Sequence, residues 1–362
     1  MKYDKSFNVG KHKIAIDRPT YFIADIAANH DGDLERAKEL IYLAKDAGAD
    51  CAKFQHFLAK DIVSDFGFRN LGAQQSHQFS WDKSVFEIYD QYHCPRDWTD
   101  LLVETCNAAD IDFMTTPYDF DAINLFSELV PAFKIGSGDI TWLAAQEQMA
   151  KTGKPVLLAC GASSMEDVTR AVNFIASINS KICLMQCNTN YTGDDGNYSY
   201  INLNVLKSFA ETWPGMILGL SDHTNGNTTV LGAVALGARV IEKHFTDDNG
   251  REGPDHHFAM NPSIWREMVD RTRELEQALG DGIKRVEENE SDTVVIQRRS
   301  IRVKSSIENG LKAGTVLTED HLECLRPCPP ESIPPYDMGK VLGKKLIRNI
   351  QAGEHLECND LS

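Results

Sequence analysis

Short β-prone apolar runs alternate with helix-periodic segments along most of the chain, and this alternation restricts its fold more than any other feature. There are eight such runs: YFIADIA, CAKFQ, DFMTT, AFKIGS, VLLAC, ICLMQC, MILGLS and RVIEKHF. Strands that alternate with helices form parallel sheets, either closed or doubly wound. A count of eight over about 270 residues favours closure. We therefore predict an α/β fold, a (β/α)8 TIM barrel.

The character of the sequence changes after Gly280. The charged run DGIKRVEENESD lacks apolar periodicity and indicates a linker. Two similar segments follow, IENGLKAGTVLTEDHL and IRNIQAGEHLECNDL, as in a small pseudo-symmetric β-rich module. We expect the barrel at residues 1–282, the linker at 283–299 and the module at 300–362.

Composition excludes several classes of protein. A net charge of −16 argues against nucleic-acid binding, which needs a basic face. No apolar run is long enough to span a membrane, and the first residues lack the apolar core of a signal peptide. The nine cysteines indicate reduced thiols, with Cys183 and Cys187 as core residues of a strand. We expect a cytoplasmic protein without nucleic-acid or membrane partners.

One connection between a strand and the next helix is unusually long, from about Phe57 to Pro95. Long loops at this position tend to carry function, although a structural cap of the barrel mouth is the alternative. Its aromatic side chains indicate an ordered segment. They are Phe66, Phe68, Phe79, Trp81 and Tyr89.

In such barrels the catalytic side chains lie at the carboxyl ends of the strands. Lys53 and Lys134 lie within apolar strands near those ends, where an unpaired ammonium is costly. With Ser137 and Ser221 they resemble a phosphate cradle. A lysine paired with a barrel carboxylate and a Schiff-base lysine are the two alternatives.

His223 and His244 end adjacent predicted strands, so their rings can converge on one ion. Two imidazoles with a carboxylate or water suit manganese, zinc, iron or cobalt better than calcium. A structural or acid–base histidine is the alternative reading. His256 and His257 are further potential ligands, but exposed loop histidines are the simpler interpretation.

At these residues the sequence resembles the sialic acid synthase family, the phosphoenolpyruvate-dependent synthases of N-acetylneuraminate and related nonulosonates. The shared motifs cover nearly the whole chain: IADIAANHDGDLERAKELI, GADCAKFQ, FMTTPYD, FKIGSGDI, GLSDHT, ALGARVIEKHFT and GPDHHFAMNP. The C-terminal unit, with LRP at Leu325 to Pro327, looks like the family's antifreeze-like (SAF) domain.

The resemblance implies roles for individual residues. Phosphoenolpyruvate would be held by Lys53, Lys134, Ser137 and Ser221, with Gln55 and Thr116 nearby. His223 and His244 would bind a divalent metal, manganese by preference or else magnesium or cobalt, with Asp255 near it. Tyr191 would contact the amino-sugar aldehyde. The family also implies a domain-swapped homodimer in which Arg326 reaches the partner's active site.

Four departures from the family pattern lie mostly on the sugar side. Asp25 and Asp139 stand where the family usually has glutamate, and Ala159 replaces a serine that helps hold phosphate. Ser163 or Ser164 is a possible substitute for that serine. The pattern QCNTNYT places Thr189 at the sugar-side asparagine and lacks the proline after Tyr191. These changes lead us to expect an acceptor other than N-acetylmannosamine, or poor use of that sugar.

The predicted reaction condenses phosphoenolpyruvate with an N-acylated hexose, N-acetylmannosamine or a related diacylamino sugar. Asp25 is the candidate for moving the proton of the attacking water, and the catalytic set is completed by Lys53, Asp139 and Arg326. Two other functions stay open at this point. One is a Schiff-base aldolase, and the other is a catalytically weakened sugar-binding homologue.

Overall fold

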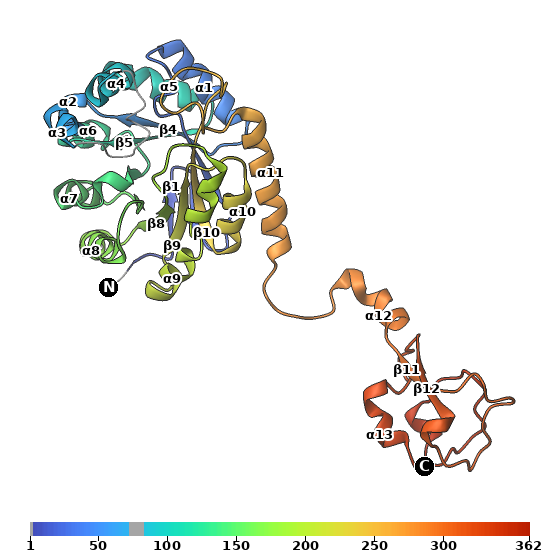
Figure 1. The fold of residues 1–362 in the computed structure, drawn as a ribbon. Helices are drawn as coiled ribbons and strands as arrows, with labels where there is room; N and C mark the ends of the chain where they lie inside the picture. Colours follow the sequence, from blue (N-terminus) through green and yellow to red (C-terminus); the bar gives the residue numbers. More distant parts are fainter. Residues whose placement is uncertain (1–2, 72–82) are drawn as a thin grey trace. The chain divides into compact units, whose positions relative to one another are not determined.

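The computed structural model describes residues 3–71 and 83–362, and the chain divides into two compact units, residues 1–280 and 281–362. In the first unit, eight parallel strands follow the order β5-β4-β3-β10-β9-β8-β7-β6. They are β3 (Tyr21–Asp25), β4 (Cys51–His56), β5 (Asp112–Pro117), β6 (Phe133–Ile135), β7 (Val156–Ala159), β8 (Ile182–Cys187), β9 (Ile217–Asp222) and β10 (Ala238–His244). Because the end strands β5 and β6 also contact each other, the sheet closes (Figure 1). The predicted barrel is confirmed.

Helices surround the strands, as Figure 1 shows. They are α1 (Leu34–Asp46), α5 (Thr99–Ala108), α6 (Phe120–Phe126), α7 (Leu143–Lys151), α8 (Met165–Ala176), α9 (Val205–Thr212), α10 (Thr228–Ala235) and α11 (Pro262–Leu279). Side-chain caps start several of them. Asp33 accepts from two amides of α1, and Ser164 forms a capping box with Asp167 on α8. No helix in the described part of the chain is long and apolar enough to cross a bilayer.

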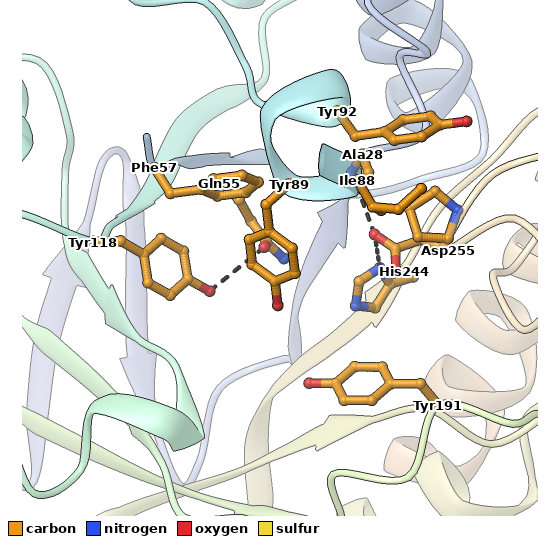
Figure 2. Close-up of a pocket in the computed structure, with 11 residues that line it drawn as sticks. Ala28, Gln55, Phe57, Ile88, Tyr89, Tyr92, Tyr118, Tyr191, His244 and Asp255 are labelled. Atoms are coloured by element: carbon orange, nitrogen blue, oxygen red, sulfur yellow. Dashed lines mark hydrogen bonds and ion pairs between the residues drawn. The ribbon is translucent and has the colours of Figure 1, made fainter. Parts of the chain in front are cut away.

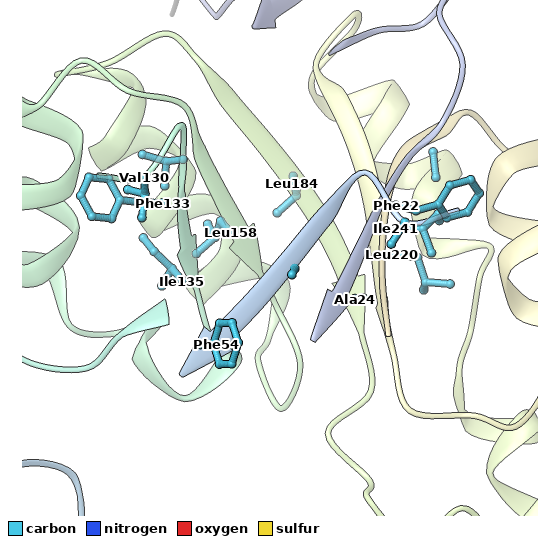
Figure 3. Packing of buried hydrophobic residues seen from close by; sticks show 14 of the residues in the cluster. Phe22, Ala24, Phe54, Val130, Phe133, Ile135, Leu158, Leu184, Leu220 and Ile241 are labelled. Atoms are coloured by element: carbon cyan, nitrogen blue, oxygen red, sulfur yellow. The ribbon is translucent and has the colours of Figure 1, made fainter. Parts of the chain in front are cut away.

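Side-chain alternation along each strand separates two cores. Residues of one parity, such as Phe22, Phe54 and Ile241, point outward and pack with the helices (Figure 3). Residues of the other parity, such as Ile23 and Met114, fill the barrel interior. The interior positions nearest the carboxyl ends of the strands are therefore the ones that open on the barrel mouth.

A hairpin that the sequence did not predict precedes the barrel. Strands β1 (Ser6–Val9) and β2 (His12–Ala15) pair antiparallel. Their apolar residues Phe7, Val9 and Ile14 belong to the interior core cluster together with Tyr21 and Ile23 at the start of β3. The hairpin thus packs onto the amino ends of the strands, opposite the predicted site.

The long connection after β4 contains three helices, α2 (Ala59–Ile62), α3 (Asp65–Asn70) and α4 (Val85–Tyr92). Helix α4 starts at a capping box between Ser84 and Glu87. Phe79 and Trp81 lie outside the described residues. The connection therefore contains ordered structure, as predicted, in the three helices α2, α3 and α4.

The second unit has its own core and a small antiparallel sheet of β11 (Ser300–Val303) and β12 (Leu322–Leu325). The predicted linker contains a short helix, α12 (Ser291–Gln297), and α13 (Met338–Val341) lies further on. The two similar sequence segments pair with each other, because Leu311 and Ile350 exchange backbone hydrogen bonds of 2.8 and 2.9 Å. This reciprocal pairing brings the two similar segments side by side.

Candidate active site

Strand register brings the predicted polar residues together at the barrel mouth. Asp25 at the end of β3 lies opposite Lys53 of β4 and His244 of β10. Further residues pair in the same way, Gln55 with Thr116 and Glu242 with Ser221. All of these have the interior parity of their strands, so their side chains form successive layers above the interior core, at the carboxyl ends of the strands.

Lys53 and Asp25 form a fully buried ion pair. Their Nζ and Oδ2 atoms are 2.6 Å apart, and Gln55 Nε2 also donates to Asp25 Oδ2 at 2.9 Å. Burial alone would lower the pKa of Lys53, but the carboxylates of Asp25 and Glu242 outweigh it, and the pKa is raised. Burial would likewise raise the pKa of Asp25, but Lys53 and His244 lower it. Both groups are therefore charged at neutral pH.

A second buried pair joins Lys134 to Glu242, with 3.2 Å between Nζ and Oε1. Ser221 Oγ donates to the same carboxylate oxygen at 3.1 Å. The sequence allowed for a carboxylate partner of Lys134 but did not identify Glu242, because the two residues come from β10 and β6. Spacing along one sequence does not show such a pairing across the barrel interior.

Ser137 begins the 3-10 turn after β6, and its Oγ accepts a hydrogen bond of 2.9 Å from the amide of Gly161. Thr189 lies beside the same glycine, since a Cβ placed on Gly161 would be 2.6 Å from Thr189 Cγ2. Ala159 is buried at the end of β7 with interior parity. Both suggested substitutes for the missing serine hydroxyl have partners in the free protein, because Ser164 caps α8 and Ser163 donates to the carbonyl of Gly161.

His223 and His244 face each other, with ring centroids 5.4 Å apart. The Tyr191 ring lies 4.2 Å from the His223 ring, and the Phe258 ring lies 5.0 Å from the His244 ring. His223 Nδ1 donates to the carbonyl of Asn188 at 2.8 Å, which leaves Nε2 as the potential ligand atom. The motif pattern did not single out Phe258 as part of this cluster.

The histidine pair fits a divalent metal that has further ligands from water or substrate. Burial lowers the pKa of His244 and favours the neutral, ligating form. His244 Nδ1 and Asp25 Oδ1 are buried without a hydrogen-bond partner among the described residues. Burial would lower the pKa of His223 too, but hydrogen bonds with Cys187 and Asn188 raise it, so metal binding there would displace a proton. Within residues 3–71 and 83–362 no three protein donors converge to complete a site.

The remaining predicted residues lie at different distances from this cluster. Asp255 Oδ2 is 3.6 Å from His244 Nδ1 and accepts a hydrogen bond from the amide of Ala28. Asp139 is half-buried, and burial raises its pKa to about 6. It is close enough to Tyr118 to help raise the pKa of that phenol, which burial raises most. Arg326 is exposed and follows β12 in the second unit.

One sequence interpretation needs correction. His256 is not an exposed loop histidine, because it is fully buried and lies 2.8 Å from Asp31 and 2.7 Å from Thr246 Oγ1. It therefore has a structural role. Cys187 is a buried core residue of β8 as expected, and hydrogen bonds from His223 and Ser137 outweigh burial and lower its thiol pKa.

A cavity of about 150 Å³ extends from His244 to helix α4 (Figure 2). Its lining includes four of the predicted residues, Gln55, Tyr191, His244 and Asp255, but not Asp139 or Thr189. The sequence missed Tyr118, whose hydroxyl donates to Gln55 Oε1 at 3.4 Å. The site can thus hold anions on its lysines and a neutral, partly apolar molecule in the cavity.

Comparison with known proteins finds a family match for each of the two units. Residues 40–284 match the NeuB family and residues 308–362 match the SAF domain. The chain is 33% identical over 341 residues to the N,N'-diacetyllegionaminic acid synthase of Campylobacter jejuni, covering 93% of this chain and 98% of that protein. It is 31% identical to the human N-acetylneuraminate-9-phosphate synthase, covering 92% and 90% of the two chains.

A solved structure is similar to this chain in both fold and sequence. It is the N-acetylneuraminic acid synthetase of Leptospira borgpetersenii in complex with citrate, with a TM-score of 0.70 and 27% identity. The match covers 80% of this chain and 95% of that chain.

Proposed function

The chain belongs to the NeuB family, and from this premise we propose that it condenses phosphoenolpyruvate with an N-acylated hexose aldehyde. The products are a sialic-acid-type nonulosonate and phosphate, and the acceptor is N-acetylmannosamine or a related diacylamino sugar. The observation that carries this proposal is the pair of buried lysines beside two facing histidines at one barrel mouth. Relatives named for legionaminic and neuraminic acid synthesis support it.

Phosphoenolpyruvate would occupy the lysine end of the mouth. Its phosphate and carboxylate are anions, and Lys53 and Lys134 are cations in a buried, weakly screened site. Ser137 and Ser221 would add hydroxyl donors. On binding, the substrate anions would take over donors that Asp25 and Glu242 engage in the free protein.

The acceptor aldehyde would lie beside the histidines, where carbon three of phosphoenolpyruvate attacks it. Water then adds to the cationic centre, and phosphate leaves from the tetrahedral intermediate. Asp25 would take the proton of that water, because its Oδ1 is buried without a partner among the described residues. Asp139 and Arg326 would orient the acceptor.

We also propose a bound divalent metal, manganese by preference, held by His223 and His244. When bound, such an ion supplies Lewis-acid polarisation of a carbonyl. The chain's own contribution is to fix the two rings: the Asn188 carbonyl orients His223, and Phe258 packs against both.

We further propose a cytoplasmic, domain-swapped homodimer in which Arg326 of the partner subunit completes the acceptor site. In support, Arg326 is exposed, and none of the described residues forms an ion pair with it. Mixing an Arg326→Ala variant with a His244→Ala variant tests this proposal. Swapped subunits would recover activity in mixed dimers, whereas inactive mixtures would contradict the swap.

The alternatives predict different chemistry. A Schiff-base lysine needs a neutral amine, whereas the pKa of Lys53 is raised and both lysines are paired with carboxylates. Borohydride with a carbonyl substrate should therefore leave the protein unmodified. A covalent adduct on Lys53 or Lys134 would support an aldolase instead.

The proposal is tested by phosphate release from phosphoenolpyruvate with a panel of aldoses. We expect release only with N-acylated amino hexoses, with N-acetylmannosamine used less efficiently than a diacylamino trideoxyhexose. A nonulosonate of the expected mass should accumulate in step with phosphate. Absence of release with every sugar would indicate a weakened binding homologue.

A further inference from the structure

The outer part of the cavity is formed by side chains that the proposed chemistry does not use. Helix α4 contributes Ile88, Tyr89 and Tyr92, and Phe57 follows the end of β4. The complete lining is Ala28, Gln55, Phe57, Ile88, Tyr89, Tyr92, Tyr118, Tyr191, His244, Pro254 and Asp255. Rings and aliphatic groups therefore dominate the end of the cavity that is remote from the lysines.

The polar groups of the lining are engaged at the inner end. Gln55 donates to Asp25 and accepts from Tyr118, while Asp255 accepts from the amide of Ala28. Because rings and aliphatic groups make up most of the outer lining, a sugar tail that carries methyl groups beside its polar atoms matches this part of the cavity better than one that carries only hydroxyls.

Helix α4 itself is held in place but incompletely covered. Its capping box fixes its start, and Tyr89 packs on Phe57 with ring centroids 5.2 Å apart. Phe57 in turn contacts Tyr118, with centroids 5.9 Å apart. None of the residues of α4 is buried, although Ile88, Tyr89 and Tyr92 share the face that lines the cavity. A ligand in the cavity would cover this face.

The tyrosines combine apolar faces with polar tips. In Figure 2 the hydroxyls of Tyr89, Tyr118 and Tyr191 point toward the middle of the cavity, and Ile88 lies above it. An acylamino group matches this combination, because its carbonyl accepts hydrogen bonds from phenols while its methyl packs against rings.

We propose that Tyr89, supported by Ile88, is a specificity-determining residue that contacts an acylamino group of the acceptor remote from its aldehyde. This inference rests on the proposed function for the identity of the acceptor. It assigns the choice between acceptor sugars to side chains of α4. The favoured acceptor class is a hexose with a second acylamino substituent. An acceptor with hydroxyls in that region would be bound less well.

The test measures binding without turnover, using sugars reduced to their alditols so that no aldehyde can react. The alditols of 2,4-diacetamido-2,4,6-trideoxymannose and of N-acetylmannosamine are titrated calorimetrically into the wild-type protein and the variants. Tyr89→Ala should weaken binding of the diacetamido alditol by about tenfold or more, and that of the other alditol by less than about threefold. Tyr89→Phe should have an intermediate effect.

Tyr42→Ala is the matched control, because Tyr42 is an exposed tyrosine on α1 outside the cavity. It should leave both affinities unchanged. Equal weakening of both alditols by Tyr89→Ala, or no weakening of either, would overturn the assignment, as would failure of the wild-type protein to bind the diacetamido alditol. Selective binding without phosphate release from phosphoenolpyruvate and the parent sugar would instead contradict the proposed function and leave the α4 subsite standing.

Discussion

The two ends of the candidate site, the buried lysines at the strand ends and the cavity beside helix α4, are built in different ways. At the strand ends, Lys53 and Lys134 are 1% and 3% exposed and are held by ion pairs between barrel strands. At the far end, Tyr89 and its neighbours on α4 are half-exposed and belong to a long connection outside the barrel. The charged end cannot change without disturbing the core, whereas the aromatic end can. A barrel of this kind can therefore keep one reaction while its acceptor varies.

The largest effect is expected where the two ends meet. His223→Ala and His244→Ala should each lower kcat by at least about a hundredfold and reduce bound manganese, because each removes half of the proposed protein ligand set. Elemental analysis and initial rates measure both quantities, and circular dichroism checks the fold. His257→Ala, in an exposed histidine, is the control. Full activity of the metal-free protein in excess chelator would exclude the two-histidine site.

The charged end should matter for stability as well as for binding. Lys53→Met leaves Asp25 buried without its partner, and we expect a loss of about 3–5 kcal/mol in the free energy of unfolding. Lys151→Met breaks an exposed helical pair with Glu147 and should cost about 0–1 kcal/mol. Urea unfolding measures both. Similar losses in the two variants would mean that the buried Lys53–Asp25 pair contributes no more to stability than an exposed ion pair.

The half-buried carboxyl of Asp139 should make the stability of the protein depend on pH. Burial raises its pKa to about 6, so the folded protein holds this proton more tightly than the unfolded chain. The stabilising effect of this tighter proton binding on the folded protein is fully present below about pH 4, and it is lost as the pH rises through about 6. Asp139→Asn should therefore be more stable than the wild type by about 1–2 kcal/mol at pH 8, and equally stable near pH 4. Unfolding at both pH values decides this, with the exposed Asp121→Asn as control. A pH-independent difference would contradict it.

The smallest effect concerns the phosphate cradle. Ala159→Ser places a hydroxyl at the interior end of β7, where the family usually has serine. One added hydrogen bond is worth about 0.5–1.5 kcal/mol, so the KM for phosphoenolpyruvate should fall by about twofold to tenfold. The KM for the sugar should stay constant. An unchanged or higher phosphoenolpyruvate KM would mean that this position does not face the phosphate.

The sequence predicted the parts of the molecule that follow local periodicity. The alternation of apolar runs and helical segments predicted the eight strands, and it placed Lys53 and Lys134 within β4 and β6 near the barrel mouth. Contacts across the barrel were not predictable in this way. The Lys134–Glu242 pair joins strands that are distant in sequence, and the burial of His256 depends on Asp31 from the opposite end of the barrel domain's chain.

The acceptor end was the hardest part to predict. Aromatic residues in the long connection indicated an ordered segment, but their composition did not show which face would point into the mouth. Only the three-dimensional position of α4 places Tyr89 near Phe57 and on the cavity. Thr189 was assigned to the sugar from the motif, yet it lies beside Gly161 and Ser137 and does not line the cavity.

The most direct test of a candidate site with two distinct ends is the KM for each substrate in two variants, Lys134→Met and Tyr89→Ala. We expect Lys134→Met to raise the KM for phosphoenolpyruvate by far more than that for the sugar, because it removes a buried cation that we propose binds the phosphate. Tyr89→Ala should do the reverse with a diacylamino hexose. If both variants change the same constant, or if Lys134→Met affects only the sugar, the two ends have been assigned wrongly.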